Sequence, residues 1–235
     1  MENKSIALVL AGGKGLRMNR DIPKQFIDIK DKPLIVHSLQ TLDKCDLINE
    51  ILIVCIKSHI ELMREISKNY DIKKVTNVIS GGNTRHESIC HGITYLSKTS
   101  KMNTVILIHN ANMPLVTEEN IRECLINGNE NNTIATSVAK NNGYFYFLKN
   151  NKLEIGPDRN EMLSAKVPEA ARLSTMCKLY NDKKFSEKKY ESYTAGMLGI
   201  LNDMSVVPVY CESTNFKITT EADYLLADKY LEIIK

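Results

Sequence analysis

The stretch SIALVLAGGKGLRM, residues 5–18, decides the fold, because it carries an apolar run directly into a cluster of glycines. The run shows no polar alternation, which is typical of a parallel strand that is buried on both faces. Gly12, Gly13 and Gly15 follow the run, and glycines let backbone N–H groups approach an anion closely. The stretch therefore predicts a first buried strand whose end carries an anion-binding turn.

Cationic side chains follow this glycine turn, namely Arg17, Arg20 and Lys24. The pattern is not a dinucleotide fingerprint, because Met18 occupies the position of its third glycine, and no GK[ST] follows to make a Walker loop. Lysine is a compact point charge suited to a phosphate oxygen, so we interpret the region as a site for a polyphosphate. A plain tight turn between a strand and a helix is the alternative.

Apolar, β-branched runs alternate with longer helix-like segments as far as about residue 140, and the later runs span 50–56, 75–80, 104–110 and 133–138. This alternation predicts an α/β protein with a mostly parallel sheet that is covered by helices on both faces. We expect one domain over residues 1–235, because a sheet of this size buries a core of its own.

From about 141 to 169 the pattern changes to alternating aromatic and polar residues around the turn-forming stretch KNNK. This change predicts a β-arm, a hairpin that projects from the sheet. Such an arm exposes Tyr144, Phe145 and Tyr146 unless a partner subunit covers them. Helical character is predicted to return at about 170–183.

Composition bounds the partners and the location of the protein. The formal net charge of +3 on 235 residues is too small to indicate nucleic acid as the main partner. The six cysteines include no CxxC pair, as expected of reduced thiols. The sequence shows no signal-peptide pattern and no run near the roughly 20 apolar residues of a membrane helix. We therefore expect a soluble, cytoplasmic protein with neither nucleic-acid nor membrane partners.

A second glycine turn, SGGNTRHES, follows the run at 75–80. Gly81 and Gly82 open it, and Arg85 and Ser88 stand three residues apart, on one face of the predicted helix. Ligands of open parallel sheets bind where the carboxyl ends of the strands meet the loops. We therefore expect both glycine turns to face one ligand, although a simple helix cap would also explain the second.

Six motifs follow one another between residue 5 and about residue 230: GGxGxRM, PKQF, GGxxRxxS, a strand ending in His109 before Pro114, DRN, and NFKITTEAD. In this order they make the chain resemble the cytidylyltransferases that act on methylerythritol 4-phosphate and ribitol 5-phosphate. The resemblance implies a Rossmann-like nucleotidyltransferase fold and CTP and Mg²⁺ as ligands. It also implies a homodimer whose exchanged arms complete each other's sites.

The resemblance further implies roles for individual residues. Catalysis would fall to Arg17, Lys24 and Lys217. The nucleotide would be bound by Ala11, Gly12, Gly13, Gly15, Gly81, Gly82, Arg85 and Ser88. The acceptor phosphate would meet Arg159 of the arm, together with Thr194 and Asn141. The metal would lie near Asn110.

The acceptor-side motifs depart from the family pattern. Asn110 and Met113 stand where the family carries the aspartate and the arginine of HDxxRP, and VPE at 167–169 replaces TPQ. Either the acceptor differs, or the chain binds nucleotide without turning it over. We favour a working enzyme, because triphosphate oxygens supply much of the coordination shell of magnesium. Ribitol 5-phosphate is the preferred acceptor and methylerythritol 4-phosphate is the alternative.

The histidines carry less of the argument. His37, His86, His91 and His109 are interpreted as packing residues rather than as catalytic bases. His86 and His91 are five residues apart, which is not the i, i+4 spacing of a metal pair on a helix.

Overall fold

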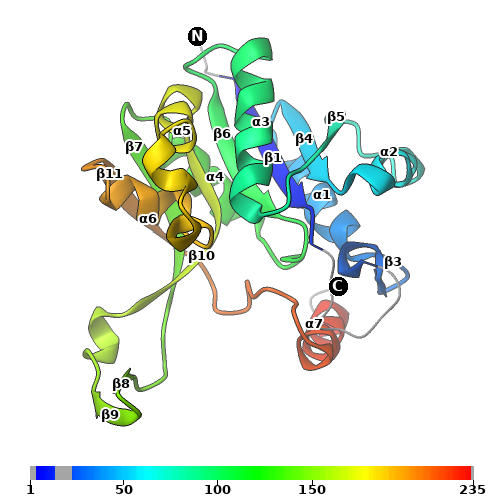
Figure 1. Ribbon diagram of the computed structural model, residues 1–235. Helices are drawn as coiled ribbons and strands as arrows, with labels where there is room; N and C mark the ends of the chain where they lie inside the picture. The colour runs from blue at the N-terminus through cyan, green and yellow to red at the C-terminus, as the bar shows by residue number, and fades with distance from the viewer. Residues whose placement is uncertain (1–3, 14–22, 234–235) are drawn as a thin grey trace.

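A seven-stranded sheet runs through the computed structural model of the protein, which describes residues 4–13 and 23–233 (Figure 1). The strand order is β11-β7-β10-β6-β1-β4-β5. The strands are β1 (Ser5–Ala11), β4 (Glu50–Cys55), β5 (Val75–Ser80), β6 (Val105–Asn110), β7 (Thr133–Lys140), β10 (Leu163–Arg172) and β11 (Ser205–Tyr210). Strand β10 runs antiparallel to both neighbours, and every other pair in this sheet is parallel. The predicted α/β fold with a mostly parallel sheet is confirmed.

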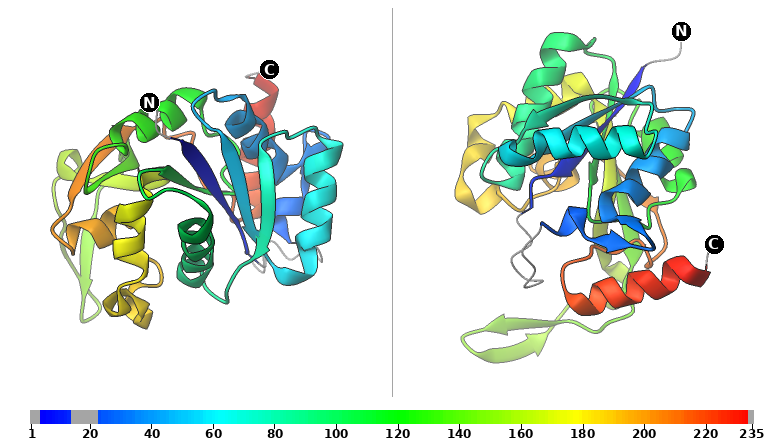
Figure 2. Two further views of the ribbon diagram at one scale, coloured as in Figure 1. Left: turned by 90° about the horizontal axis from the view of Figure 1, so that it is seen from above. Right: turned by 90° about the vertical axis from the view of Figure 1, so that its right-hand side faces the viewer.

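Helices cover both faces of the sheet (Figure 2). They are α1 (Leu34–Lys44), α2 (Ile60–Asn69), α3 (Arg85–Thr99), α4 (Glu118–Asn127), α5 (Leu173–Tyr180) and α6 (Ala195–Ile200). The C-terminal helix α7 (Glu221–Ile233) packs in a separate cluster instead. Alternate residues of β1 join different cores: Ala7 and Val9 pack in the cluster of α1, α2 and α4. Ile6 and Leu8 pack in that of α3, α5 and α6. The unbroken apolar run of β1 is explained by this burial on two sides.

Helix α3 lies unusually close to the sheet. A Cβ atom placed on Gly92 would come within 2.5 Å of Leu8 Cδ1, so only glycine fits the present spacing between α3 and β1. The first turn of α3 carries two residues of the second glycine motif, Arg85 and Ser88. The packing of Gly92 therefore fixes the height of these two side chains above the sheet.

A third, smaller apolar cluster joins distant parts of the chain near the end of β1. It combines residues from the short strands β2 (Asp28–Ile29) and β3 (Lys32–Pro33) and their surroundings with residues from the C-terminal helix α7. Its buried members are Ile27, Ile29, Leu34, Leu115, Ile218, Ala227 and Leu231. The cluster packs the segment after Lys24 against the segment that carries Lys217.

The predicted arm is present and projects far from the sheet (Figures 1 and 2). Its hairpin consists of β8 (Tyr146–Lys149) and β9 (Lys152–Ile155), joined by Asn150 and Asn151, which have φ of 50° and 59°. Two consecutive residues with positive φ are typical of a tight hairpin turn that favours asparagine. The side chain of Ile155 is 90% exposed and that of Tyr144 is 79% exposed.

The predicted bounds of the arm, about 141 to 169, are wrong at the second end. Residues from Leu163 onward form β10, which pairs with β7 from Lys140 and then enters the sheet between β7 and β6. Helix α5 begins only at Leu173, rather than near residue 170. The stretch VPEAAR gives little strand signal, because its alanines and glutamate are poor strand formers, and burial between two strands overrides that preference.

Among the described residues, no helix combines the length and the apolar character that a membrane span requires.

Candidate active site

A cavity of about 660 Å³ opens where the carboxyl ends of four neighbouring strands meet. The last residues of β1, β4, β5 and β6 all contribute to its lining: Ala11, Cys55, Ser80 and Asn110. This is the edge of an open parallel sheet at which ligands bind. The lining also includes Gly12, Gly13, Lys24, Gln25, Lys57, Gly81, Gly82, Asn83, Thr84, Arg85, Ser88, Asn112 and Lys217.

The first glycine turn and Lys24 meet at this cavity. A Cβ on Gly13 would lie 3.6 Å from Lys24 Cε, so the bare backbone and the lysine stem are close neighbours. Gln25 is buried and donates from Nε2 to the carbonyl of Ala11 at 2.8 Å, which ties the PKQF segment to the end of β1. Two predicted residues, Gly15 and Arg17, lie outside the described residues.

The second glycine turn is packed against the start of α3. Thr84 caps the helix by accepting from the N–H of Glu87 at 3.0 Å, and Glu87 accepts from the N–H of Asn83, the residue before the cap, at 2.6 Å. Ser88 accepts from the N–H of Gly82 at 3.2 Å. A Cβ on Gly81 would come within 2.7 Å of Ser88 Oγ, so the turn requires glycine there. The motif therefore caps α3 and also lines the cavity.

Lys217 reaches the same cavity from the far end of the sequence. It lies in an irregular segment between β11 and α7, and it lines the cavity together with Lys24. Lys24 Nζ donates to the carbonyl of Ile218, the next residue after Lys217, at 3.3 Å. The structure thus brings PKQF and NFKITT into direct contact, although about 190 residues separate them.

The end of β6 shows why its histidine is not a catalytic group. His109 is fully buried, and its Nε2 lies 3.1 Å from the carbonyl of Met113 and 3.4 Å from Ser38 Oγ. Burial lowers the pKa of His109 to about 4, against an ordinary value of 6.5, although the Met113 carbonyl opposes this shift. The imidazole is therefore neutral near pH 7, and the predicted structural role fits.

The cavity is strongly positive. Lys24, Lys57, Arg85 and Lys217 line it, and no aspartate or glutamate does so within residues 4–13 and 23–233. The one thiol at its wall, Cys55, is unsuited to nucleophilic attack, because burial raises its pKa to about 11. Clustered cations in a cleft concentrate an anionic ligand. The cavity is therefore built to hold an anion rather than to attack one covalently.

The chemistry of the lining also bears on a metal. Asn110 offers an amide oxygen, which is a hard ligand acceptable to Mg²⁺ but carries no charge. A bare Mg²⁺ ion would be repelled by the four cationic side chains, with little negative charge nearby to offset that repulsion. A metal already chelated by a polyphosphate meets no such obstacle, so the donor set fits a metal that arrives with the anionic ligand.

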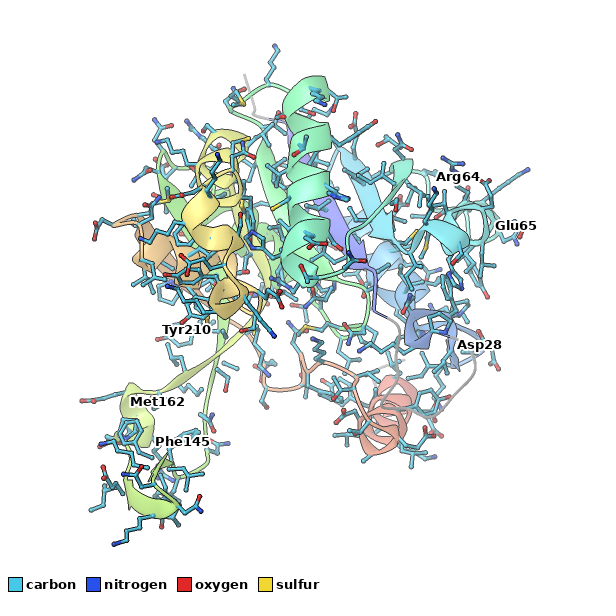
Figure 3. All side chains as sticks on the ribbon, viewed as in Figure 1. Asp28, Arg64, Glu65, Phe145, Met162 and Tyr210 are labelled. Atoms are coloured by element: carbon cyan, nitrogen blue, oxygen red, sulfur yellow. The ribbon has the colours of Figure 1, made fainter. Side chains whose placement is uncertain are left out.

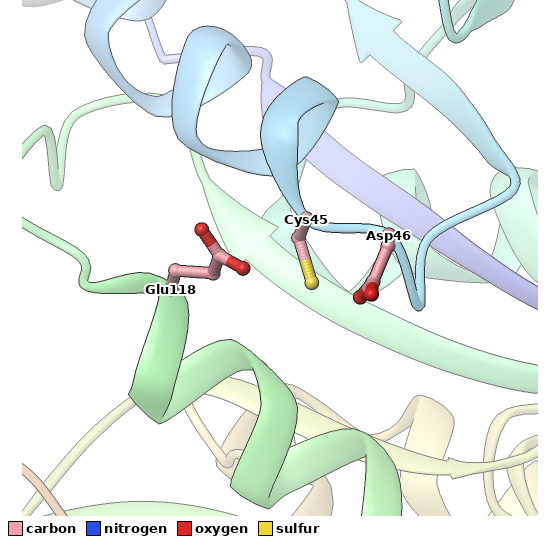
Figure 4. A group of neighbouring side chains, drawn as sticks. All are labelled: Cys45, Asp46 and Glu118. Carbon is pink, nitrogen blue, oxygen red and sulfur yellow. The ribbon is translucent and has the colours of Figure 1, made fainter.

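A different group of metal-ligand side chains lies elsewhere in the molecule (Figure 4). Cys45, Asp46 and Glu118 approach one another closely. Arg122 donates to Asp46 and, at 3.0 Å, to Glu118, so both carboxylates already have a cationic partner. Burial also raises the pKa of the Cys45 thiol. This cluster is an ion-pair network between α1 and α4, and it carries no argument for a metal.

Three predicted acceptor residues do not line the cavity. Arg159 lies on the exposed arm, where its guanidinium stacks on Tyr144 at 5.0 Å from the ring centre. Figure 3 shows the arm side chains Phe145 and Met162 set apart from the body of the molecule. Asn141 donates to Ser164 Oγ at 3.0 Å at the base of the arm, and Thr194 caps α6 through the N–H of Met197 at 3.3 Å.

Of the substitutions on the acceptor side, Asn110 lines the cavity and the others do not. Met113 and Val167 are both buried, and neither lines the cavity. Glu169 is fully buried and accepts from Thr136 Oγ1 at 2.9 Å and from the N–H groups of Ala195 and Gly196 at 3.1 and 2.9 Å. Its carboxylate therefore anchors the start of α6.

Sequence reasoning missed several residues of the lining, among them Lys57, Asn83 and Asn112. Lys57 directly follows the carboxyl end of β4, so the rule that located the glycine turns would have found it. Asn83 lies within the second glycine motif, between the residues that were singled out. No local signal marked Asn112, because its role depends on contacts with Ile218.

Comparisons with known proteins by sequence and by structure point to the same family. The family model of IspD, 2-C-methyl-D-erythritol 4-phosphate cytidylyltransferase, matches residues 5–233. The 2-C-methyl-D-erythritol 4-phosphate cytidylyltransferase of Clostridium botulinum (strain Loch Maree / Type A3) is 31% identical over 234 residues, which is 98% of each chain. The ribitol-5-phosphate cytidylyltransferase of Lacticaseibacillus paracasei is 29% identical over 228 residues, covering 96% of this chain and 97% of the relative.

A solved structure shares the whole fold. The 4-diphosphocytidyl-2C-methyl-D-erythritol synthase of Anaerococcus prevotii superposes with a TM-score of 0.83 at 23% identity, over 98% of this chain and 97% of that one. The relatives carry two different acceptors in their names, so likeness alone leaves the acceptor undecided. The family model nevertheless spans the sheet, the cavity and the arm. The chain belongs to the IspD family of cytidylyltransferases, and its fold is the Rossmann-like nucleotidyltransferase fold of that family.

Proposed function

We propose that the protein transfers CMP from CTP to a phosphorylated sugar alcohol, ribitol 5-phosphate or a close analogue, and releases pyrophosphate. One observation carries the proposal: Lys24, Lys217 and the two glycine turns line a single positive cavity at the carboxyl edge of the sheet. Such a lining suits a triphosphate. The choice of CTP as the nucleotide rests on the family, which is one of cytidylyltransferases.

The reaction needs little covalent chemistry from the protein. A phosphate oxygen of the acceptor attacks the α-phosphorus of CTP, a new P–O bond forms, and the bond to the pyrophosphate oxygen breaks. Negative charge accumulates on the transferred group and on the leaving pyrophosphate. Lys24 and Lys217, with Arg17 from the glycine loop, stabilise that charge, and preorganised cations of this kind supply most of the rate enhancement.

The two glycine turns have a different task. Gly12 and Gly13 are proposed to offer bare backbone to the triphosphate, and Gly15 is the third glycine of the same sequence motif. Ala11, Gly81 and Gly82 lie along the walls, with Arg85 and Ser88 on the first turn of α3. We assign this second group to the cytosine and the ribose.

We also propose Mg²⁺ as the metal, bound to the triphosphate and contacted by Asn110. When bound, it neutralises phosphate charge and orients the α-phosphate for in-line attack. The amide of Asn110 adds one neutral oxygen to a shell that phosphate oxygens dominate. The site residues of this chain hold the phosphates, and they leave most of the metal's coordination to the substrate.

The arm supplies the acceptor side of the proposal. Arg159, Asn141 and Thr194 are proposed to contact the acceptor, and Arg159 does so in the cavity of a second subunit. Support comes from the exposure of the arm and from the position of Arg159 on its exposed returning segment, between β9 and β10. We propose a homodimer with exchanged arms, in the cytoplasm, with no role for nucleic acid or membrane.

Two alternatives are specific enough to test. Methylerythritol 4-phosphate has equal support as the acceptor, because the matching relatives include enzymes named for each acceptor. The other alternative is a nucleotide-binding subunit without turnover, and the observation that favours it is Asn110 in place of the family aspartate.

One experiment separates all three readings. Pyrophosphate release from CTP and Mg²⁺ is measured with ribitol 5-phosphate, methylerythritol 4-phosphate and a panel of other polyol phosphates, for the wild type and for Asn110→Asp. The preferred reading predicts the highest kcat/KM with ribitol 5-phosphate or a near analogue. Higher kcat/KM with methylerythritol 4-phosphate selects the first alternative, and turnover that occurs only in Asn110→Asp selects the second.

A further inference from the structure

The loop that carries Lys217 needs an outside support. Residues 211–220 form neither helix nor strand, so no regular hydrogen-bond ladder holds them. A charge that stabilises a transition state must stay in place, because small displacements weaken its action strongly. The loop is held instead by hydrogen bonds to several other parts of the molecule, and one of these contacts reaches from the cavity wall.

Asn112 makes that contact with two hydrogen bonds to one residue. Its side-chain amide donates to the carbonyl of Ile218 at 2.8 Å, and its own carbonyl accepts from the N–H of Ile218 at 2.9 Å. Asn112 is 6% exposed and Ile218 is fully buried, so water competes little for these bonds. The pair is a clip between the turn after β6 and the loop of Lys217.

The clip also reaches Lys24. The carbonyl of Ile218 that accepts from Asn112 accepts from Lys24 Nζ at 3.3 Å as well. One buried carbonyl thus joins the residue next to Lys217, the amide of Asn112 and the ammonium of Lys24. The side chain of Ile218 packs into the third apolar cluster, while Lys217 beside it lines the cavity.

The turn that bears Asn112 is itself well anchored. The N–H of Ala111 donates to the carbonyl of Leu10 at 3.0 Å, and that of Met113 donates to the carbonyl of Asn110 at 3.1 Å. The turn therefore moves with β1 and β6 at the centre of the sheet. Because the loop of Lys217 is hydrogen-bonded to this turn, the loop is held in place by the centre of the sheet.

We propose that Asn112 is a positioning residue, whose amide donor fixes Lys217 and Lys24 relative to each other within the cavity. The inference deepens the proposed function and rests on it. Asparagine suits the place, because it donates without adding charge beside two cations. An aspartate there would accept only, lose the side-chain bond to the Ile218 carbonyl while keeping the backbone bond, and pair with a lysine that the phosphates require.

The test compares Asn112→Ala and Asn112→Asp with Asn120→Ala, a matched control. Asn120 is equally buried, lies in α4 and accepts from Ser137 Oγ at 3.0 Å, away from the cavity lining. We expect both Asn112 variants to lower kcat by about 10- to 100-fold, the range for a misplaced catalytic group. The control should lose stability but keep its kcat.

A double-mutant cycle distinguishes positioning from general damage. If Asn112 acts through Lys217, Asn112→Ala should reduce kcat little further in a Lys217→Ala background. Fully multiplicative losses would overturn the inference. An unchanged kcat in Asn112→Ala would also overturn it, while the proposed function would stand on wild-type turnover.

Hydrogen exchange provides a readout that needs no activity. In Asn112→Ala, amides of residues 215–219 should exchange at least tenfold faster than in the wild type, whereas Asn120→Ala should leave them unchanged. Unchanged exchange in Asn112→Ala contradicts the clip. A wild type without turnover on any acceptor contradicts the proposed function, and hydrogen exchange then decides the clip by itself.

Discussion

The cavity and the arm are held in opposite ways. The cavity lies at the ends of four neighbouring strands, three of which (β1, β4 and β6) are almost completely buried. The arm leaves the sheet with Leu148, Leu153 and Ile155 exposed, and its hairpin carries no core of its own. The difference teaches that one chain suffices to form the cavity, whereas the exposed apolar side chains of the arm fit the proposed contact with a second subunit.

The largest effect should come from the cavity side of this comparison. Lys24→Ala removes a cation of the cavity that the proposed function places beside the triphosphate, and removal of one preorganised donor typically lowers kcat by about 10²–10³-fold. The measurement is steady-state pyrophosphate release, with the exposed Lys98→Ala in α3 as the control. An unchanged kcat would show that Lys24 has no catalytic role and is a surface lysine. The contrast between the cavity and the arm would then be lost.

The second prediction concerns the stability of the fold beside the cavity, which should depend on the protonation of His109. The folded protein keeps this histidine neutral with a pKa of about 4, whereas the unfolded chain takes up the proton near pH 6.5. Stability should therefore fall as the pH drops from about 6.5 to 4, by up to about 3 kcal/mol at 1.36 kcal/mol per pKa unit. Urea unfolding at several pH values measures this, and His109→Gln should flatten the profile; parallel profiles would contradict it.

The arm is tested by Arg159→Ala. Loss of one charge-assisted contact to the acceptor phosphate, worth roughly 1.5–3 kcal/mol, should raise the acceptor KM by about 10- to 100-fold. The KM for CTP should stay nearly constant. Equal changes in the KM for the acceptor and in the KM for CTP would show that Arg159 has no specific contact with the acceptor.

Mixed dimers sharpen the same point. Lys24→Ala subunits combined with Arg159→Ala subunits should regain one competent site in each mixed dimer if the arms are exchanged. Tandem-tagged mixed dimers, purified and assayed against each parent, give the measurement. No recovery would argue that each arm serves its own chain.

The smallest predicted effect concerns the hydrogen bonds that join the end of the Lys217 loop to Asp223 at the start of α7. Burial acts to raise the pKa of Asp223, but hydrogen bonds from Thr219 and Thr220 outweigh burial and lower it to about 2. Asp223→Ala should destabilise the protein by about 1 kcal/mol, as the loss of a helix cap does. Urea unfolding checks this value against Glu65→Ala on the surface of α2. A destabilisation no larger than that of the control would contradict the role of the cap.

Much of the cavity could be predicted because its residues follow strand ends. Gly12 and Gly81 come directly after apolar runs, and the carboxyl ends of parallel strands meet at one edge. Lys217 was identified by resemblance alone, since nothing in its local sequence indicates a strand end. The third apolar cluster brings it to Lys24, and such long-range packing leaves no pattern in either segment.

The unpredicted parts depend on contacts that are distant in the chain. Strand β10 was missed because Pro168 and the two alanines after it resemble neither a strand nor a turn. Asn112 was missed because an asparagine in a turn has a sufficient local explanation. In each case a partner from another element decides the role of the residue.

The reversed direction of β10 has a consequence for how such enzymes diversify. Because β7 leaves the sheet and β10 returns to it as paired neighbours at Lys140 and Leu163, the hairpin between them can grow or shrink without changing the strand order. Each added residue per leg would extend its reach by about 3.4 Å. The reach of the arm is thus a length that can change while the cavity at the ends of β1, β4, β5 and β6 stays as it is.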